Sequence, residues 1–186
     1  MSDWNRTVHK LPDDHAWTCK RGYNIFVGSA GAIRFDIPED WIVEPTSDSI
    51  MFHDKPPPDD DCRLQVSIIH LPPGIDWSTL PLTKLLDDAV LKDDPRDLTV
   101  RRAPKVFQRP GLELAWVESR FIEPNEQREA RTRSCLARGN DIQALITFDF
   151  WPEHVQRFVP VWNEVLRTLR LGEYVSGFEG RRLYRG

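Results

Sequence analysis

The sequence predicts a single α+β domain, built mainly of antiparallel strands with two helices. Alternating apolar and polar residues recur along the chain and are separated by short turn signals, as in half-buried strands. Two other segments repeat their apolar residues every three to four positions, as amphipathic helices do. The 186 residues are 40% hydrophobic and include seven Trp, so a chain of this length can build one sizeable core. We expect one domain over residues 17–172, a loosely held arm over residues 1–16 and a tail over residues 173–186.

A hairpin opens the predicted domain. Residues 23–27 and 33–37 alternate, and a Gly-Ser-Ala-Gly segment supplies the flexible link between them. Pro38 has no backbone N–H to donate to a sheet, so it is expected to end the second strand. Trp41 follows after two acidic turn residues and is expected to fold back onto the sheet.

Two more strands and a helix are predicted next. A short strand covers residues 49–53 and a longer one residues 64–71. The connection between them, Asp-Lys-Pro-Pro-Pro-Asp-Asp-Asp-Cys, suits an exposed loop because it is stiff and acidic. Pro81 then marks a helix start, and the helix is expected to stop at Asp94-Pro95. Its apolar stripe consists of Leu82, Leu85, Leu86, Ala89 and Val90.

The second half of the chain predicts a meander of strands. Residues 98–100 and 106–107 are weak strand candidates, whereas both faces of residues 112–121 are apolar. Strands over residues 129–138 and 142–151 are joined by Gly-Asn-Asp, which favours a tight reverse turn and an antiparallel pair.

A last helix follows from the helical spacing of Val155, Phe158, Trp162, Val165 and Leu169, together with Val159 and Leu166. Pro160 interrupts this pattern. Either the helix kinks there, or a first turn after Pro152 gives way to a main helix that starts near Pro160. Gly172 is expected to close it.

The order of these elements gives the chain a family resemblance. Phe35, Pro38 and Trp41 in FDIPEDW and Trp162 in WNEVLRTLRL resemble the PsbP/Mog-like family, which includes the DcrB-like bacterial proteins. The resemblance covers about residues 22–172 by pattern. It implies an antiparallel sheet of about six strands sandwiched between helices, an α/β/α arrangement.

Members of that family include extrinsic subunits of photosystem II, import factors that bind the Ran GTPase and bacterial chaperones of secreted toxins. They share binding to another macromolecule without known catalysis. The resemblance therefore implies a protein-binding role, but no binding residue is carried over to this sequence.

The net charge, the hydropathy and the cysteines exclude several classes of partner and site. The net charge of −4 provides no overall basic field for nucleic acid or anionic lipid. No run of 18 apolar residues and no secretory signal pattern is present, so we expect a cytoplasmic protein that does not insert into membranes. Cys19, Cys62 and Cys135 are far apart and predict reduced thiols rather than disulfides or a zinc site.

One set of side chains could hold a metal ion if the strands that flank the proline loop pair as a hairpin. It consists of His53, Asp54, Asp59, Asp60, Asp61 and His70. Their nitrogen and oxygen atoms suit a hard or borderline cation. The acidic triplet lacks the alternate spacing and glycine of a calcium loop, and acids beside prolines are usually solvated. We therefore predict no cofactor, no metal ligand and no catalytic residue; the Gly-Ser-Ala-Gly segment also lacks phosphate-loop and nucleophile-elbow spacing.

The densest basic region contains Arg101, Arg102, Arg128, Arg131, Arg133 and Arg138. It could bind an acidic partner or a phosphate, but cross-strand pairing with Glu118 or other acids is the favoured interpretation. Among the indoles, Trp41, Trp116, Trp151 and Trp162 are predicted core residues. Trp4, Trp17 and Trp77 are better candidates for partner contacts.

The sequence thus favours a non-enzymatic protein-binding module, such as an adaptor or chaperone. It would act through a sheet face, a groove beside a helix or self-association. Two alternatives remain open. One is a metal-dependent protein or enzyme using His53, His70 and Asp59–Asp61, and the other is a small-molecule carrier with a cavity between sheet and helix.

Overall fold

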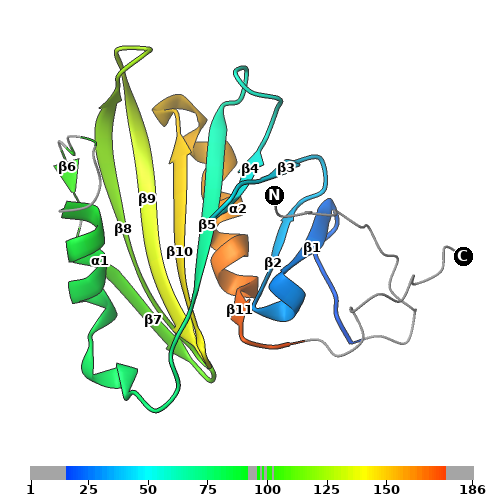
Figure 1. Cartoon of the computed structure of the whole chain (residues 1–186). Helices are drawn as coiled ribbons and strands as arrows, with labels where there is room; N and C mark the ends of the chain where they lie inside the picture. The colour runs from blue at the N-terminus through cyan, green and yellow to red at the C-terminus, as the bar shows by residue number, and fades with distance from the viewer. Residues whose placement is uncertain (1–15, 92–95, 97, 99, 102, 175–186) are drawn as a thin grey trace, which may run out of the picture.

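The computed structural model describes residues 16–91, 96, 98, 100–101 and 103–174 (Figure 1). The predicted arm and most of the tail, Trp4, Arg102 and the Asp94-Pro95 stop lie outside these residues. Within them, the strands are β1 (Tyr23–Gly28), β2 (Ile33–Pro38), β3 (Ile42–Pro45), β4 (Ile50–His53), β5 (Cys62–His70), β6 (Val100–Arg101), β7 (Lys105–Arg109), β8 (Leu112–Glu123), β9 (Arg128–Gly139), β10 (Ile142–Phe150) and β11 (Arg170–Leu171). The helices are α1 (Leu82–Leu91) and α2 (Val155–Thr168), with short 3₁₀ turns η1 (Ser29–Gly31), η2 (Trp77–Thr79) and η3 (Pro152–His154).

The strands form two antiparallel sheets. The larger has eight strands in the order β3-β4-β5-β10-β9-β8-β6, and β7 also pairs with β8. The smaller has the order β1-β2-β11. The expected sheet of about six strands was therefore too small, because β3, β6 and β7 are short and carry little alternating signal. The hairpins β1–β2 and β9–β10 confirm the two predicted turns.

Helices cover both faces of the large sheet. Figure 1 shows α1 on one side of it and α2 on the other, with β1 and β2 beyond α2. The buried side chains of α1, Leu82 and Leu86, pack with Ala115, Val117 and Leu136 on one face of the sheet. This layering confirms the α/β/α arrangement and explains why β8 is apolar on both faces.

An aromatic cluster forms the main core between the large sheet and α2. Trp41 is 5% exposed, and its ring centroid lies 6.0 Å from that of Phe148 and 6.4 Å from that of Phe158. Trp116 and Trp162 are also buried, with centroids 5.6 Å apart. Trp41 therefore folds back onto the sheet as predicted.

Trp151 is an exception to the predicted core, since it is only half-buried. β10 ends one residue earlier, at Phe150, and the guanidinium carbon of Arg128 lies 4.2 Å from the Trp151 ring centroid. The indole thus lies at the rim of the sheet under a charged side chain.

Helix α2 runs through Pro160 without a break. It begins at Val155, after the turn η3, so the predicted start near Pro160 is wrong. Pro160 lies on the exposed side of α2, where the loss of one hydrogen bond is offset by water. Gly172 does not close the helix either, because Leu169 caps it and β11 intervenes.

Candidate functional site

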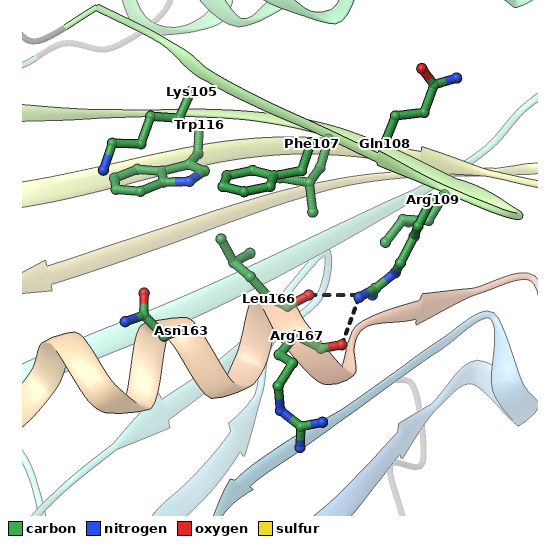
Figure 2. A pocket seen from close by; sticks show the side chains of 10 residues that line it. Lys105, Phe107, Gln108, Arg109, Trp116, Asn163, Leu166 and Arg167 are labelled. Atoms are coloured by element: carbon green, nitrogen blue, oxygen red, sulfur yellow. Dashed lines mark hydrogen bonds between the residues drawn. The ribbon is translucent and has the colours of Figure 1, made fainter.

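A groove of about 450 Å³ lies between strand β7 and helix α2, and we call it the β7–α2 groove (Figure 2). It forms where the edge of the large sheet extends past the helix. Its walls are Lys105, Phe107, Gln108 and Arg109 of β7, Leu112, Leu114 and Trp116 of β8, and Asn163, Leu166 and Arg167 of α2.

Strand alternation sets which side chains of β7 face the groove. Lys105 pairs with Trp116 of β8, Phe107 with Leu114 and Arg109 with Leu112. Because directly paired residues project to the same side of a sheet, these three β7 side chains lie over the apolar face that packs on α2. Figure 2 shows Phe107 beside the Trp116 ring and Gln108 pointing the other way.

The groove combines a buried floor with an exposed apolar edge. Leu112, Leu114 and Trp116 are at most 8% exposed. On β7, by contrast, Val106 is 62% exposed and Phe107 is 57% exposed. Within the described residues, β7 pairs with β8 alone, so its second edge carries no strand. The apolar surface of the core thus continues onto an open sheet edge.

Arg109 joins the edge strand to the end of α2. Its Nη1 donates to the carbonyl oxygen of Arg167 at 2.6 Å, and its Nη2 donates to those of Leu166 at 3.3 Å and Leu169. The last carbonyls of a helix have no partner within the helix and carry partial negative charge, so a guanidinium is well placed there. Burial, followed by the nearby Arg170 and Arg167, lowers the pKa of Arg109. This residue is a structural clamp that fixes one wall of the groove.

The rim of the groove is basic although the protein is acidic overall. The Lys105 ammonium lies 4.7 Å from the centroid of the Trp116 ring, and it makes no ion pair with the part of the chain that the structure describes. Arg167 is bound to Glu164, with Nη2 and Oε1 2.6 Å apart. Lys105 and Arg109 therefore give the edge strand a positive charge, and neither forms an ion pair with a carboxylate of the described residues.

The residues of the alternative metal site do not all converge. His53 pairs with Arg63 near the start of β5, whereas His70 is the last residue of that strand. Seven residues of strand place them roughly 23 Å apart along the sheet. Among the described residues, no group of three or more His, Cys, Asp or Glu side chains is arranged to hold a metal ion.

The acids of the proline loop instead hold that loop in place. Asp60 Oδ2 lies 2.9 Å from His53 Nδ1. Asp54, which is buried, accepts from the backbone N–H of Asp61 at 2.9 Å and lies 2.9 Å from Arg157 Nη1 of α2. The expectation that the acidic triplet is merely solvated is therefore wrong for Asp60, which pairs with His53, and for Asp61, which pairs with Lys55 at 2.6 Å.

A second hollow of about 500 Å³ lies beside this loop. Some of its charged side chains are paired: Asp149 Oδ2 lies 2.9 Å from Arg96 Nη1 and 3.4 Å from Arg63 Nη2. Five acidic side chains and two arginines line this hollow, so its walls are more polar than those of the β7–α2 groove, where we place the candidate site.

The arginine-rich region confirms the cross-strand interpretation. Arg133 Nε and Nη2 donate to Glu118 Oε2 at 2.9 and 2.8 Å, and Arg131 Nη1 lies 3.5 Å from Glu118 Oε1. Arg138 Nε donates to Glu113 at 2.6 Å. These guanidiniums are structural, since each is tied to a carboxylate of the neighbouring strand β8.

The three cysteines are free thiols, as predicted. Cys62 and Cys135 are buried, and burial is the largest cause that raises the pKa of each thiol. Burial also raises the pKa of the exposed Cys19. A raised pKa keeps these groups protonated at neutral pH, so they are poor nucleophiles.

The two remaining indoles of the described residues, Trp17 and Trp77, make contacts within the chain. The guanidinium carbon of Arg34 lies 4.2 Å from the Trp17 ring centroid, and Trp77 Nε1 donates to the Pro72 carbonyl at 3.4 Å. Their role in partner contacts stays a prediction. The sequence reasoning missed Lys105, Phe107 and Arg109; the only signal for this edge was the weak strand candidate over residues 106–107.

Comparison with known proteins places the chain in a family. The sequence model of the Alr1449 family matches residues 24–175. The chain belongs to the Alr1449 family. A relative from Nostoc sp. (strain PCC 7120), named uncharacterized protein alr1449, is 42% identical over 173 residues. That match covers 92% of this chain and 89% of the relative.

Solved structures show the fold of this Alr1449-family protein. Cyanobacterial PsbP (CyanoP) from Synechocystis sp. PCC 6803 matches with a TM-score of 0.55 and 14% identity, over 84% of this chain and 98% of that one. The Ran-binding protein Mog1p of Saccharomyces cerevisiae matches with a TM-score of 0.52 and 11% identity, over 80% of this chain and 95% of that one.

Two further structures share this architecture. LpqN of Mycobacterium tuberculosis has a TM-score of 0.54 at 11% identity, over 80% of this chain and 90% of that one. A protein from Bacteroides thetaiotaomicron has a TM-score of 0.54 at 15% identity; the match covers 81% of this chain, which spans 48% of that longer chain. The fold is PsbP/Mog-like. Among the described residues, neither helix has the length and apolarity needed to cross a membrane.

Proposed function

We propose that this Alr1449-family protein is a non-enzymatic protein-binding module, a single domain over residues 17–172, whose partner docks at the β7–α2 groove. The observation that carries the proposal is the exposure of Val106 and Phe107 on an edge strand that borders an apolar hollow. Exposed apolar residues on an edge strand favour association and are usually avoided unless a partner covers them.

The shape of the groove supports a protein partner. Its floor is aromatic and aliphatic, and its rim carries Lys105, Asn163 and Arg167. Interfaces place buried apolar anchors at their centre and polar groups at their rim. A cytoplasmic location and a lack of catalysis remain part of this proposal. The fold shared with Mog1p, a Ran-binding protein, also supports a macromolecular partner.

Site-specific photo-crosslinking in the native cells tests this function. A benzophenone amino acid replaces Phe107 in the full chain, and a matched control places it at Ile75, which is 52% exposed on the loop between β5 and α1 and does not line the groove. We expect a discrete crosslinked protein from position 107 and not from position 75. The substitution Leu166→Glu, added to the chain that carries the benzophenone at position 107, should abolish the crosslink, because Leu166 lines the groove and a buried charge there opposes docking. Equal labelling from both positions, or none from position 107, contradicts the proposal.

A small-molecule carrier is the second candidate. The specific observation in its favour is the volume of the groove, about 450 Å³, which lies between sheet and helix and falls within the range of ligand pockets. A carrier predicts that some compound raises the melting temperature and that Leu114→Trp, which fills the floor, removes this shift without unfolding the protein. A library without any hit argues for the protein partner.

A further inference from the structure

We infer that the occupant of the β7–α2 groove is an extended segment of a partner protein that adds to β7 as a further strand and carries carboxylates two positions before and two positions after an apolar residue. This inference rests on the proposed function and names the chemistry of the partner. It follows from the length of the free edge, the alternation of β7 and the charge at the groove rim.

The available edge is short and well bounded. Between Arg101 and Lys105 the edge strand advances four residues, while the paired positions on β8, Ser119 and Trp116, are three residues apart. One extra residue therefore interrupts the pairing in this interval, and Pro104 there has no N–H to donate. The regular edge is β7 itself, five residues or roughly 16 Å. A partner strand thus needs a core of about five residues.

The side chains of β7 dictate the pattern of that core. Lys105, Phe107 and Arg109 alternate along the groove face, so a strand beside them places every second side chain against them. Opposite charges directly across two strands stabilise the pair, and an apolar residue beside Phe107 extends the apolar floor. Since the β7 pattern is basic, apolar, basic, its complement is acidic, apolar, acidic in either strand direction.

A symmetric second copy fits this edge poorly. If two β7 strands paired antiparallel about Phe107, Lys105 of one copy would lie opposite Arg109 of the other, twice. Like charges directly opposite each other are destabilising. Arg109 cannot move away from this position without losing its bonds to the carbonyl oxygens of Leu166 and Arg167. The charge on this edge therefore selects a different, acidic partner.

The test uses blocked, fluorescein-labelled peptides with the central sequence Glu-Thr-Leu-Val-Glu, or the same peptide with both Glu replaced by Lys. Fluorescence anisotropy with the full chain at low ionic strength should show binding of the acidic peptide that is about tenfold tighter. Salt should weaken it. Lys105→Glu should abolish or reverse the preference, whereas Lys84→Glu, the same charge change on the exposed surface of α1, should leave it unchanged. Methylation of alternate backbone nitrogens of the peptide should weaken binding about tenfold, because strand addition uses those N–H groups.

The outcomes separate this inference from the proposed function. Equal binding of the two peptides, indifference to Lys105→Glu, or indifference to N-methylation overturns the inference, and a crosslink from position 107 would still support protein docking there. Dimerisation of the chain that Phe107→Glu abolishes, measured by sedimentation, also overturns it in favour of a second copy. The absence of any crosslink from position 107 removes both proposals.

Discussion

The buried ion pair between Glu118 and Arg133 allows a quantitative test of how the large sheet is held together. Both side chains are 7% exposed. The two hydrogen bonds from Arg133 reach Glu118 Oε2, and the guanidinium carbon lies 5.2 Å from the Trp116 ring centroid and 5.9 Å from that of Trp162. The pair therefore lies at the centre of the core, between β8, β9 and α2.

Removing one partner breaks both hydrogen bonds of the pair and leaves the other charge buried; when Arg133 is replaced, Glu118 keeps only the longer contact with Arg131, at 3.5 Å, among the ion pairs described above. We expect Glu118→Leu or Arg133→Met to lower the free energy of unfolding by about 3–5 kcal/mol each. Glu118→Leu also deprives Arg131, 3.5 Å away, of its carboxylate. The double variant leaves neither charge of this pair and fills the space with apolar atoms, so we expect it to cost no more than about 2 kcal/mol, mainly from the lost guanidinium–aromatic contacts.

Urea unfolding of the four proteins, followed by tryptophan fluorescence and by circular dichroism, measures these differences as a double-mutant cycle. Coincident transitions by the two probes serve as the control for two-state behaviour. If the double variant costs the sum of the two single variants, the carboxylate and the guanidinium contribute independently. That result would refute the idea that burial couples the two charges.

Three further predictions concern other parts of the molecule. Asp36 is 4% exposed and its Oδ2 has no hydrogen-bond partner; burial and then Glu164 raise its pKa. Because the pKa of Asp36 is higher in the folded than in the unfolded protein, its charged form destabilises the fold above that pKa. Asp36→Asn should therefore raise the free energy of unfolding by about 1 kcal/mol at neutral pH, as measured by urea unfolding. This gain should shrink as the pH falls through the raised pKa, and a gain that stays constant would contradict the prediction. Arg109→Met should lower the free energy of unfolding by about 1–3 kcal/mol and speed amide hydrogen exchange in the last turn of α2. Unchanged exchange there would show that the bonds from Arg109 to the helix carbonyls do not stabilise this turn. In thermal unfolding, Trp41→Ala should lower the free energy of unfolding by about 3–5 kcal/mol and Trp77→Ala by less than about 1 kcal/mol. Comparable losses would contradict the idea that the buried indole of Trp41 contributes more to the core than the indole of Trp77.

Local pattern was sufficient for the elements whose side chains alternate between two environments. Over residues 142–151 the apolar alternation predicted a strand, and β10 ends one residue earlier, at Phe150. The same holds for the corner at Trp41, since a proline that ends a strand leaves the next large apolar residue free to pack on the sheet. Pattern could not decide between a continuous helix and a new start at Pro160; the structure has one helix that continues through this residue, which lies on the exposed side of α2.

The candidate site lay beyond local pattern. Lys105, Phe107 and Arg109 form a groove only because β8 brings Trp116 beneath them and because the C-terminal end of α2 lies against Arg109. Conversely, the sequence allowed His53 and His70 to bind one metal ion, but the structure keeps them apart. The register of β4 on β5 places His53 beside the start of β5, whereas His70 lies at its end.

By itself the sequence determined the fold class, the main strands and helices and the identity of most core indoles, because these depend on the period of burial within one segment. Only the tertiary structure decided which charges pair, which edge of the sheet stays open and where a groove forms. Those properties depend on strand register and on helices that are distant in sequence, and a local period contains no information on either.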